Sequence, residues 1–290
     1  MIDLHLHTTA SDGRLTPSSL VTLASKRRLR IISVTDHDTV AGLDEARDMA
    51  VALGIRLING IEITAIEQGR DVHVLGYFFD PSSENLARFL HIQRESRIER
   101  VRQIAAKLQS MDLAIDVDAI LDVALKQRGR SVGRPALADA LVAAGHAVDR
   151  RDAFDRLLAT GRPAFVPRSG PELADVVSAI SDAGGIASLA HPGLNGLDGE
   201  IPRFARSGLS AIEARHRDHP PEVEAHYRRI AETLGLAVSG GSDFHGEIGA
   251  SVADVDPGQP GPGSVSLTRE DFSLLEARLQ RDAGKHAGMH

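Results

Sequence analysis

The sequence predicts an α/β protein: a distorted, seven-stranded (βα)7 TIM-like barrel with a helical insertion subdomain. Three observations lead to this fold. Short apolar runs alternate with amphipathic helical stretches, which is the pattern of right-handed βαβ units around a parallel sheet. Seven such runs occur over 290 residues, which fits a closed barrel better than an open sheet. A stretch between residues 81 and 162 is helical throughout and interrupts the alternation.

Four of the expected strands precede the insertion. The first alternates apolar with polar side chains, as strand periodicity requires. Thr16 followed by Pro17 is typical of a helix start, so a helix is expected from Pro17 to Lys26. A second helix is expected over residues 42–53, with Gly54 ending it. The four strands are expected over residues 2–7, 30–35, 56–63 and 71–78.

Residues 81–162 are expected to form a helical insertion that caps the mouth of the barrel, where loops that carry function emerge. Two apolar stripes at helical spacing indicate its helices: Ile98, Val101, Ala105 and Leu108, and Leu137, Leu141 and Ala144. Residues 1–80 and 163–283 would together form the barrel. Its later elements are expected to be strands at 185–190, 209–214 and 236–239, a loop over 256–263, a last helix over 269–281 and a disordered tail over 284–290.

Composition excludes several classes of protein. The chain is 42% hydrophobic and 25% charged, a balance that excludes a disordered or collagen-like chain. It has no cysteine, so any metal must be held by His, Asp or Glu. A net charge of −7 excludes a globally basic nucleic-acid coat. The first residues form an expected strand rather than a signal peptide, and no stretch is long enough to span a bilayer. We therefore expect a cytoplasmic enzyme with no membrane association and no obligate protein partner.

Residues that can bind metal gather at the ends of the expected strands. The pair His5 and His7 lies on one face of the first strand, close enough to chelate one ion, and Asp243 and His245 have the same spacing. Glu62 is the candidate bridging ligand. So many converging histidines and carboxylates are the usual mark of a cluster of two or three divalent ions. The nine candidate ligands are His5, His7, Asp12, His37, Glu62, His73, His191, Asp243 and His245.

These residues also carry a family resemblance. The motifs D-L-H-x-H-T, S-D-G, T-D-H-D, G-x-E, H-x-x-G, A-H-P and G-S-D-F-H resemble those of the PHP (polymerase and histidinol phosphatase) family, in order from Ile2 to about His245. The resemblance implies a distorted seven-stranded barrel with a trinuclear metal centre. Carried over by position, one ion would be held by His5, His7, Glu62 and Asp243, a second by Glu62, His73 and His191, and a third by Asp12, His37 and His245.

Within the family, the S-D-G-x-L-T-P stretch and the insertion are most similar to a branch that acts on nucleotides. That branch includes 3′,5′-nucleotide bisphosphate phosphatases and 5′-to-3′ exoribonucleases. Many other members have a histidine in place of Asp12, which disfavours histidinol phosphate as the substrate. The expected reaction is hydrolysis by a metal-bridging hydroxide, and Asp243 and Glu62 are the ligands expected to be essential for catalysis. Mn²⁺ is the first choice of metal, with Fe²⁺ or Zn²⁺ as alternatives.

The expected substrate is anionic. Three divalent ions bring about +6 and three carboxylates about −3, so the centre stays cationic and favours a phosphate over a neutral amide. Arg134 matches the arginine that binds substrate phosphate in the family, and Arg168 is a candidate by position. Asp38 is a further candidate substrate contact, and Asp38 and Asp3 are both expected to orient the ligand histidines. His216 and His219 are candidates for the general acid or for leaving-group contacts, or alternatively form a hydrogen-bonded loop pair.

The substrate would be a 3′,5′-bisphosphonucleotide, converted to a 5′-nucleotide and phosphate, or a short RNA from which mononucleotides are released in the 5′-to-3′ direction, or both. Three alternatives stay open: an amidohydrolase-like C–N hydrolase, a phosphatase of a non-nucleotide phosphomonoester, and a non-catalytic domain. The third predicts missing ligands, and none is missing. A basic stretch in the insertion is most simply a solvated helix face, or else a track for oligonucleotide phosphates. It contains Arg88, Arg94, Arg97, Arg100, Arg102 and Lys107.

Overall fold

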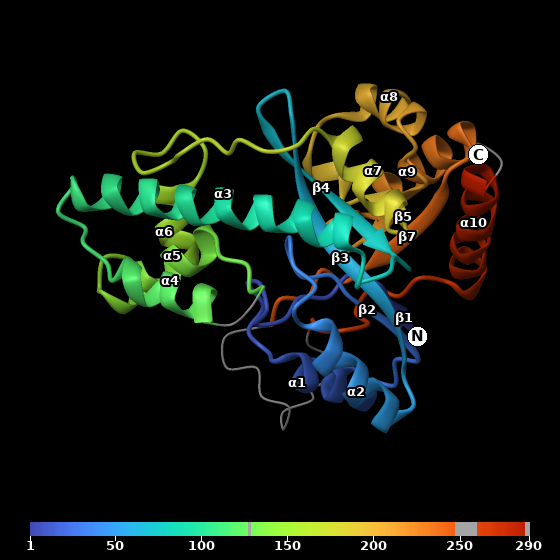
Figure 1. Cartoon of the computed structure of the whole chain (residues 1–290), viewed down its shortest axis with the longest axis horizontal. Coiled ribbons are helices and arrows are strands. Elements are labelled where there is room, and N and C mark those ends of the chain that lie inside the picture. The colour runs from blue at the N-terminus through green and yellow to red at the C-terminus, as the bar shows by residue number, and fades with distance from the viewer. Residues whose placement is uncertain (127–128, 247–259, 288–290) are drawn as a thin grey trace.

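Seven strands form one sheet that curls until its edge strands meet, as the computed structural model of the chain shows (Figure 1). The structure describes residues 1–126, 129–246 and 260–287. At the seam, the Leu4 amide donates to the Gly240 carbonyl at 3.2 Å, and Leu6 forms a bridge with Phe244. The strands follow one another around the barrel in chain order: β1 (Ile2–Asp3), β2 (Ile31–Val34), β3 (Arg56–Glu67), β4 (Arg70–Tyr77), β5 (Ile186–Leu189), β6 (Ala211–His216) and β7 (Ala237–Gly241). The expected seven-stranded barrel is confirmed.

The expectation of an all-parallel sheet is wrong for β4, which runs antiparallel to both β3 and β5. Only Gln68 and Gly69 separate β3 from β4, too few residues for a crossover helix. Both have positive φ, 52° and 75°, as a two-residue hairpin turn requires. The reversed strand distorts the barrel, and it brings His73 into the barrel mouth from mid-strand rather than from a strand end.

Helices cover the outside of the barrel: α1 (Pro17–Lys26), α2 (Leu43–Leu53), α7 (Leu173–Asp182), α8 (Ile201–Arg206), α9 (Pro221–Leu234) and α10 (Arg269–Ala287). The α1 start is as expected, because the Thr16 side chain accepts a hydrogen bond from the Ser19 amide. Gly54 ends α2 with a φ of 65°, a left-handed conformation that favours glycine. The last helix is longer than expected, since α10 continues through residues 284–287. The remaining residues of the expected tail, 288–290, and the first half of the expected loop, 256–259, lie outside the described residues.

The insertion projects to one side of the barrel and has its own apolar cluster (Figure 1). Its helices are α3 (Glu84–Gln109), α4 (Val117–Lys126), α5 (Arg134–Ala143) and α6 (Arg150–Ala153), followed by a π-helical turn over Phe154–Leu158. The four residues of the first expected stripe are buried. In the second stripe Leu137 and Leu141 are buried, whereas Ala144 is the exposed C-cap of α5. None of the described helices is long and apolar enough to cross a membrane.

Candidate metal centre

The nine predicted ligands converge at the mouth of the barrel, brought there by the loops after β1, β2, β5 and β7 and by β3 and β4 themselves. Two of them, His191 and Asp243, have positive φ values of 27° and 50°. Such backbone conformations cost about 1–3 kcal/mol each and persist where the surrounding structure enforces them, often at functional sites. The backbone at these two residues is therefore strained, and this strained conformation directs both side chains into the barrel mouth.

Glu62 lies at the middle of the cluster and is 1% exposed. Its Oε1 is 2.8 Å from His73 Nδ1 and 3.1 Å from His191 Nε2. Its Oε2 is 3.0 Å from His37 Nδ1 and 3.3 Å from His7 Nε2. His5 Nε2 lies 3.4 Å from the same Oε2. Burial alone would raise the pKa of Glu62, but the surrounding histidines, His37 foremost, hold it well below the usual range. Each oxygen of an ionised carboxylate thus faces a different set of imidazoles, as a bridging ligand would.

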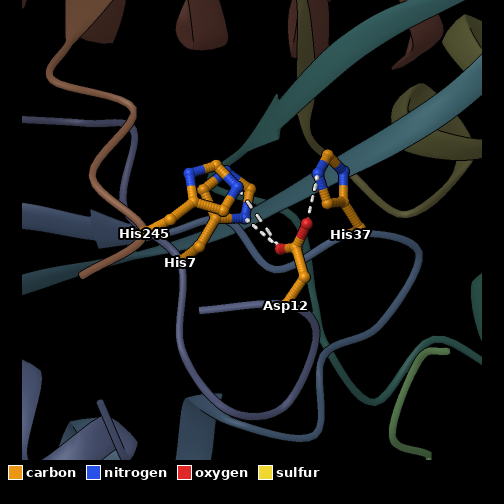
Figure 2. Close-up of side chains that lie close together, drawn as sticks. All are labelled: His7, Asp12, His37 and His245. Atoms are coloured by element: carbon orange, nitrogen blue, oxygen red, sulfur yellow. Dashed lines mark ion pairs between the residues drawn. The ribbon is translucent and has the colours of Figure 1, made fainter. Parts of the chain in front are cut away.

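The other two carboxylates organise the rest of the cluster. Asp243 Oδ1 is 3.3 Å from His5 Nε2 and 3.2 Å from His7 Nε2. Figure 2 shows Asp12 with one oxygen toward His7 and His245 and the other toward His37. The Asp12 distance to His245 Nε2 is 3.3 Å, and the His7 and His245 rings stack 4.0 Å apart. Donor atoms at about 2.0–2.2 Å from a common ion lie about 3.0–3.5 Å from one another, so these spacings fit metal ligands.

Unsatisfied polar atoms in the cluster provide a second test of this interpretation. Buried nitrogen and oxygen atoms nearly always have a hydrogen-bond partner, because leaving one unpaired is costly. Here the barrel mouth contains several buried atoms for which the described residues supply none. They are His5 Nε2, both ring nitrogens of His7, His37 Nδ1, Glu62 Oε2, His73 Nδ1, His191 Nδ1 and His216 Nε2. Bound cations would satisfy most of these lone pairs, so the residues fit a metal cluster.

Glu213 on β6 contacts two candidate ligands and was not among the residues expected from the sequence. It is fully buried, its Oε1 lies 2.9 Å from His5 Nδ1, and its Oε2 accepts the His191 amide at 2.8 Å. The carboxylate keeps the Nδ1 proton on His5 and turns Nε2 toward Glu62 and Asp243. A carboxylate behind a ligand histidine fixes the ring and its tautomer. The only sequence signal was a glutamate within the apolar strand LSAIEA.

Asp3 and Asp38 do not orient ligand rings as expected. Asp38 accepts the Thr64 amide at 2.9 Å, and its Oδ2 lies 2.5 Å from Arg97 Nε. Asp3 bonds backbone amides and the Ser242 hydroxyl, so its contact with His5 is to the amide and not to the imidazole. Asp3 therefore fixes the backbone around the ligands, and Asp38 anchors an arginine from the insertion.

The two histidines after the sixth strand differ from each other. His219 uses both nitrogens within the loops: Nδ1 donates to the Ala214 carbonyl, and Nε2 accepts the Gly193 amide. This matches the loop-pair alternative. His216 is at the cluster, with Nε2 3.5 Å from Asp243 Oδ2. Of the pair, only His216 is brought to the candidate centre.

Arginines gather beside the cluster around a cavity of 190 Å³, which we call the arginine hollow. The predicted substrate residues Arg134 and Arg168 both line it, together with Arg97, Arg100 and His73. Burial and the neighbouring Arg97 lower the pKa of Arg168 to about 9, and burial lowers that of Arg100 to about 10. These side chains stay protonated near neutral pH, so the hollow holds positive charge that a bound anion would offset.

Two arginines of the basic stretch on α3 are not on a solvated helix face, as was expected, but in the arginine hollow. Arg100 is 9% exposed, and the Arg97 side chain is 10% exposed. Both point from α3 toward the cluster rather than into solvent, because α3 lies along the barrel mouth. They are therefore part of the same pocket as the candidate ligands, and a separate oligonucleotide track that includes them is ruled out by this placement.

Comparisons with known proteins agree on one family. The family model of the PHP domain matches residues 3–155. A 3′,5′-nucleoside bisphosphate phosphatase from Chromobacterium violaceum is 34% identical over 97% of this chain and 99% of its own length. The 5′-3′ exoribonuclease Rnm of Escherichia coli is 33% identical over 84% of each chain. A solved structure from Bifidobacterium adolescentis, assigned as a metal-dependent phosphoesterase, has a TM-score of 0.84 and 34% identity over 96% of each chain.

Proposed function

The chain belongs to the PHP domain family, and on that premise we propose that it is a metal-dependent phosphoesterase that hydrolyses phosphate esters of nucleotides. One observation carries the proposal. A cluster of six histidines and three carboxylates, with buried lone pairs that lack partners among the described residues, directly adjoins a hollow lined by four arginines. The cluster suits divalent cations, and the arginines suit the oxygens of a phosphate.

Each group of this centre has a proposed task. The nine ligands would hold two or three divalent ions, with Glu62 belonging to two of the candidate ligand groups, and Mn²⁺ is our first choice. When bound, the ions supply Lewis-acid stabilisation of phosphoryl charge and a lowered pKa of water. Arg134 and Arg168 would bind a substrate phosphate in the arginine hollow. Asp38 keeps Arg97 in place at the border between that hollow and the cluster.

One bond accounts for both substrate classes. In a 3′,5′-bisphosphonucleotide, water adds to the 3′-phosphorus, the P–O3′ bond breaks, and O3′ takes a proton. In a 5′-phosphorylated RNA the same P–O3′ bond of the first nucleotide breaks, and the phosphate stays on the shortened chain. Both reactions release a 5′-nucleotide with a free 3′-hydroxyl. Arg97 and Arg134 are paired with Asp38 and Asp71, but the four arginines still exceed these two carboxylates. A neutral amide would not offset the remaining positive charge, so C–N hydrolysis is disfavoured.

The proposal is tested by product analysis with purified, Mn²⁺-loaded protein and adenosine 3′,5′-bisphosphate. Release of AMP and phosphate that stops on chelation is the expected result. Asp243→Asn should abolish it, because Asp243 faces both His5 and His7, whereas Asp44→Asn, a change at a 94% exposed side chain, should not. No phosphate release, or full turnover by Asp243→Asn, would contradict the proposal.

A further inference from the structure

A second cavity opens beside the metal cluster, and the proposed mechanism does not yet use it. Its volume is 290 Å³, and it lies between the insertion and the loop that follows β1. Ser131 ties the two sides together, because its amide donates to the Ala10 carbonyl at 2.9 Å. We call it the second hollow. It shares Asp12, His37 and Arg97 with the arginine hollow, so the two cavities meet at the metal cluster.

The second hollow has the charge of an anion site. Four arginines line it, Arg14, Arg97, Arg130 and Arg150, against the two carboxylates of Asp12 and Asp139. Arg97 is already paired with Asp38, which lies outside the lining, so the other three arginines face these two carboxylates. Asp139 accepts two hydrogen bonds from Arg150, each 2.5 Å long, and its Oδ1 lies 3.9 Å from Arg14. Asp139 thereby holds two guanidinium groups at the rim, and their charge exceeds its own. Asp12 belongs to the metal cluster, where bound cations would offset its charge.

The size of the two cavities indicates how they are used. Ordinary small-molecule pockets measure about 300–1,000 Å³, so the arginine hollow is smaller than such a pocket and the second hollow is at the lower limit. A monophosphate ester at the metal cluster has one organic substituent and needs one hollow. A phosphodiester has two organic substituents, one on each side of the phosphorus, and needs two. The paired hollows that diverge from the cluster therefore match a diester.

Resting on the proposed function, which already includes 5′-phosphorylated RNA as a substrate, we propose that the second hollow binds the nucleotide downstream of the cleaved bond. The first nucleotide would place its 5′-phosphate among Arg100, Arg134 and Arg168. The next phosphate would lie at the metal cluster, and the sugar-phosphate that follows would lie near Arg14 and Arg150. Hydrolysis adds water to that phosphorus, breaks P–O3′ and protonates O3′. Neither an oxidant nor another co-reactant is needed.

Two substrates isolate the second hollow. Adenosine 3′,5′-bisphosphate and the 5′-phosphorylated dinucleotide pApA share the first nucleotide and the scissile bond, and differ in the downstream nucleoside. The measured quantity is the ratio of kcat/KM for the dinucleotide to kcat/KM for the bisphosphate. Arg150→Gln should lower this ratio about tenfold, because it removes a charged contact to the downstream part. Asp139→Asn should raise it about threefold, because it frees Arg150 and Arg14 from their counter-ion.

Arg151→Gln is the matched control, since Arg151 is the next residue on α6, its side chain is 90% exposed, and its ion pair is with Asp155. It should leave the ratio unchanged. An unchanged ratio in both Arg150→Gln and Asp139→Asn would overturn the inference. Wild-type protein that cleaves the bisphosphate but not pApA would overturn it too, while leaving the proposed function intact. Cleavage of neither substrate would overturn the proposed function itself.

Discussion

Replacing Glu213 by glutamine tests whether the buried β6 carboxylate sets the tautomer of a metal ligand. Glu213 accepts from two donors, His5 Nδ1 and the His191 amide. A glutamine has one acceptor oxygen, so its NH₂ group must face one of these two partners. The His191 amide cannot lose its proton, so the amide oxygen must face it. The NH₂ group then faces His5 Nδ1, which becomes an acceptor and leaves the proton on Nε2. A protonated Nε2 cannot bind an ion beside Glu62 and Asp243.

In Glu213→Gln, His5 is no longer held in the orientation and tautomer that bind metal, and one nearby negative charge is lost. Both changes weaken Mn²⁺ binding. Removing a carboxylate behind a ligand histidine typically weakens metal binding about 10- to 100-fold, which corresponds to about 1.4–2.7 kcal/mol. Glutamine has the same shape as the fully buried Glu213 side chain, so the packing around it is kept and we expect the fold to persist. We therefore expect the midpoint of Mn²⁺ activation to rise by that factor, with turnover partly restored at saturating metal.

The assay is calorimetric Mn²⁺ titration of metal-free protein, combined with the Mn²⁺ dependence of phosphate release. Glu224→Gln is the control, because Glu224 lies on α9 and pairs with Arg228 away from the cluster. Mn²⁺ affinity of Glu213→Gln within about twofold of the wild type would refute the tautomer argument.

Four further predictions follow from the same contacts. Arg100→Gln should lower kcat/KM about tenfold for mononucleotide and oligonucleotide substrates alike, because Arg100 lines the arginine hollow; a loss confined to oligonucleotides in steady-state kinetics would contradict its inward placement. His219→Gln should lower the free energy of unfolding by about 1 kcal/mol and leave kcat nearly unchanged, because both ring nitrogens of His219 bind loop backbone. Thermal unfolding and steady-state kinetics measure the two effects, and a loss of about 100-fold or more in kcat would instead identify His219 as a general acid. Chelation should lower Tm by about 5–10 °C if free metal is near 100 Kd, and scanning calorimetry that shows no shift would contradict a site in the native fold. Burial lowers the pKa of His7, but contacts with Asp243 and Glu62 outweigh this effect and raise the pKa to about 10. An entering ion must therefore displace a proton from His7, so Mn²⁺ affinity should rise with pH below that value. Competition titrations that give equal affinity at about pH 6.5 and 8.5 would contradict this expectation.

Local sequence patterns were sufficient for most of the barrel. Strand periodicity, the Thr16 cap and the Gly54 stop depend on residues that are neighbours in the chain, so they could be recognised directly. The direction of β4 was missed because the third strand was expected to end at Ile63, which left seven residues before the fourth. In the structure β3 continues to Glu67, and the remaining connection, Gln68-Gly69, permits only a hairpin. The candidate ligands were found because their residue types recur at strand ends.

Contacts between distant parts of the chain were harder to predict. Glu213 meets His5 across 208 residues, and no local pattern shows that a strand glutamate has such a partner. The inward placement of Arg97 and Arg100 depends on where α3 lies against the barrel, which the helix sequence does not encode by itself. The roles of Asp3 and Asp38 were misjudged for the same reason, since both act on backbone or arginine groups. Cytoplasmic location, the absence of an obligate protein partner and the choice of Mn²⁺ stay predictions.

The central claim is that the histidine and carboxylate cluster, loaded with more than one ion, is what hydrolyses the nucleotide. The most direct test is to titrate Mn²⁺ into metal-free protein while bound metal and phosphate release from adenosine 3′,5′-bisphosphate are measured in the same samples. We expect two or three bound ions per chain, with turnover that appears only as the second ion binds. Full turnover with one ion per chain, or without any bound metal, would contradict it.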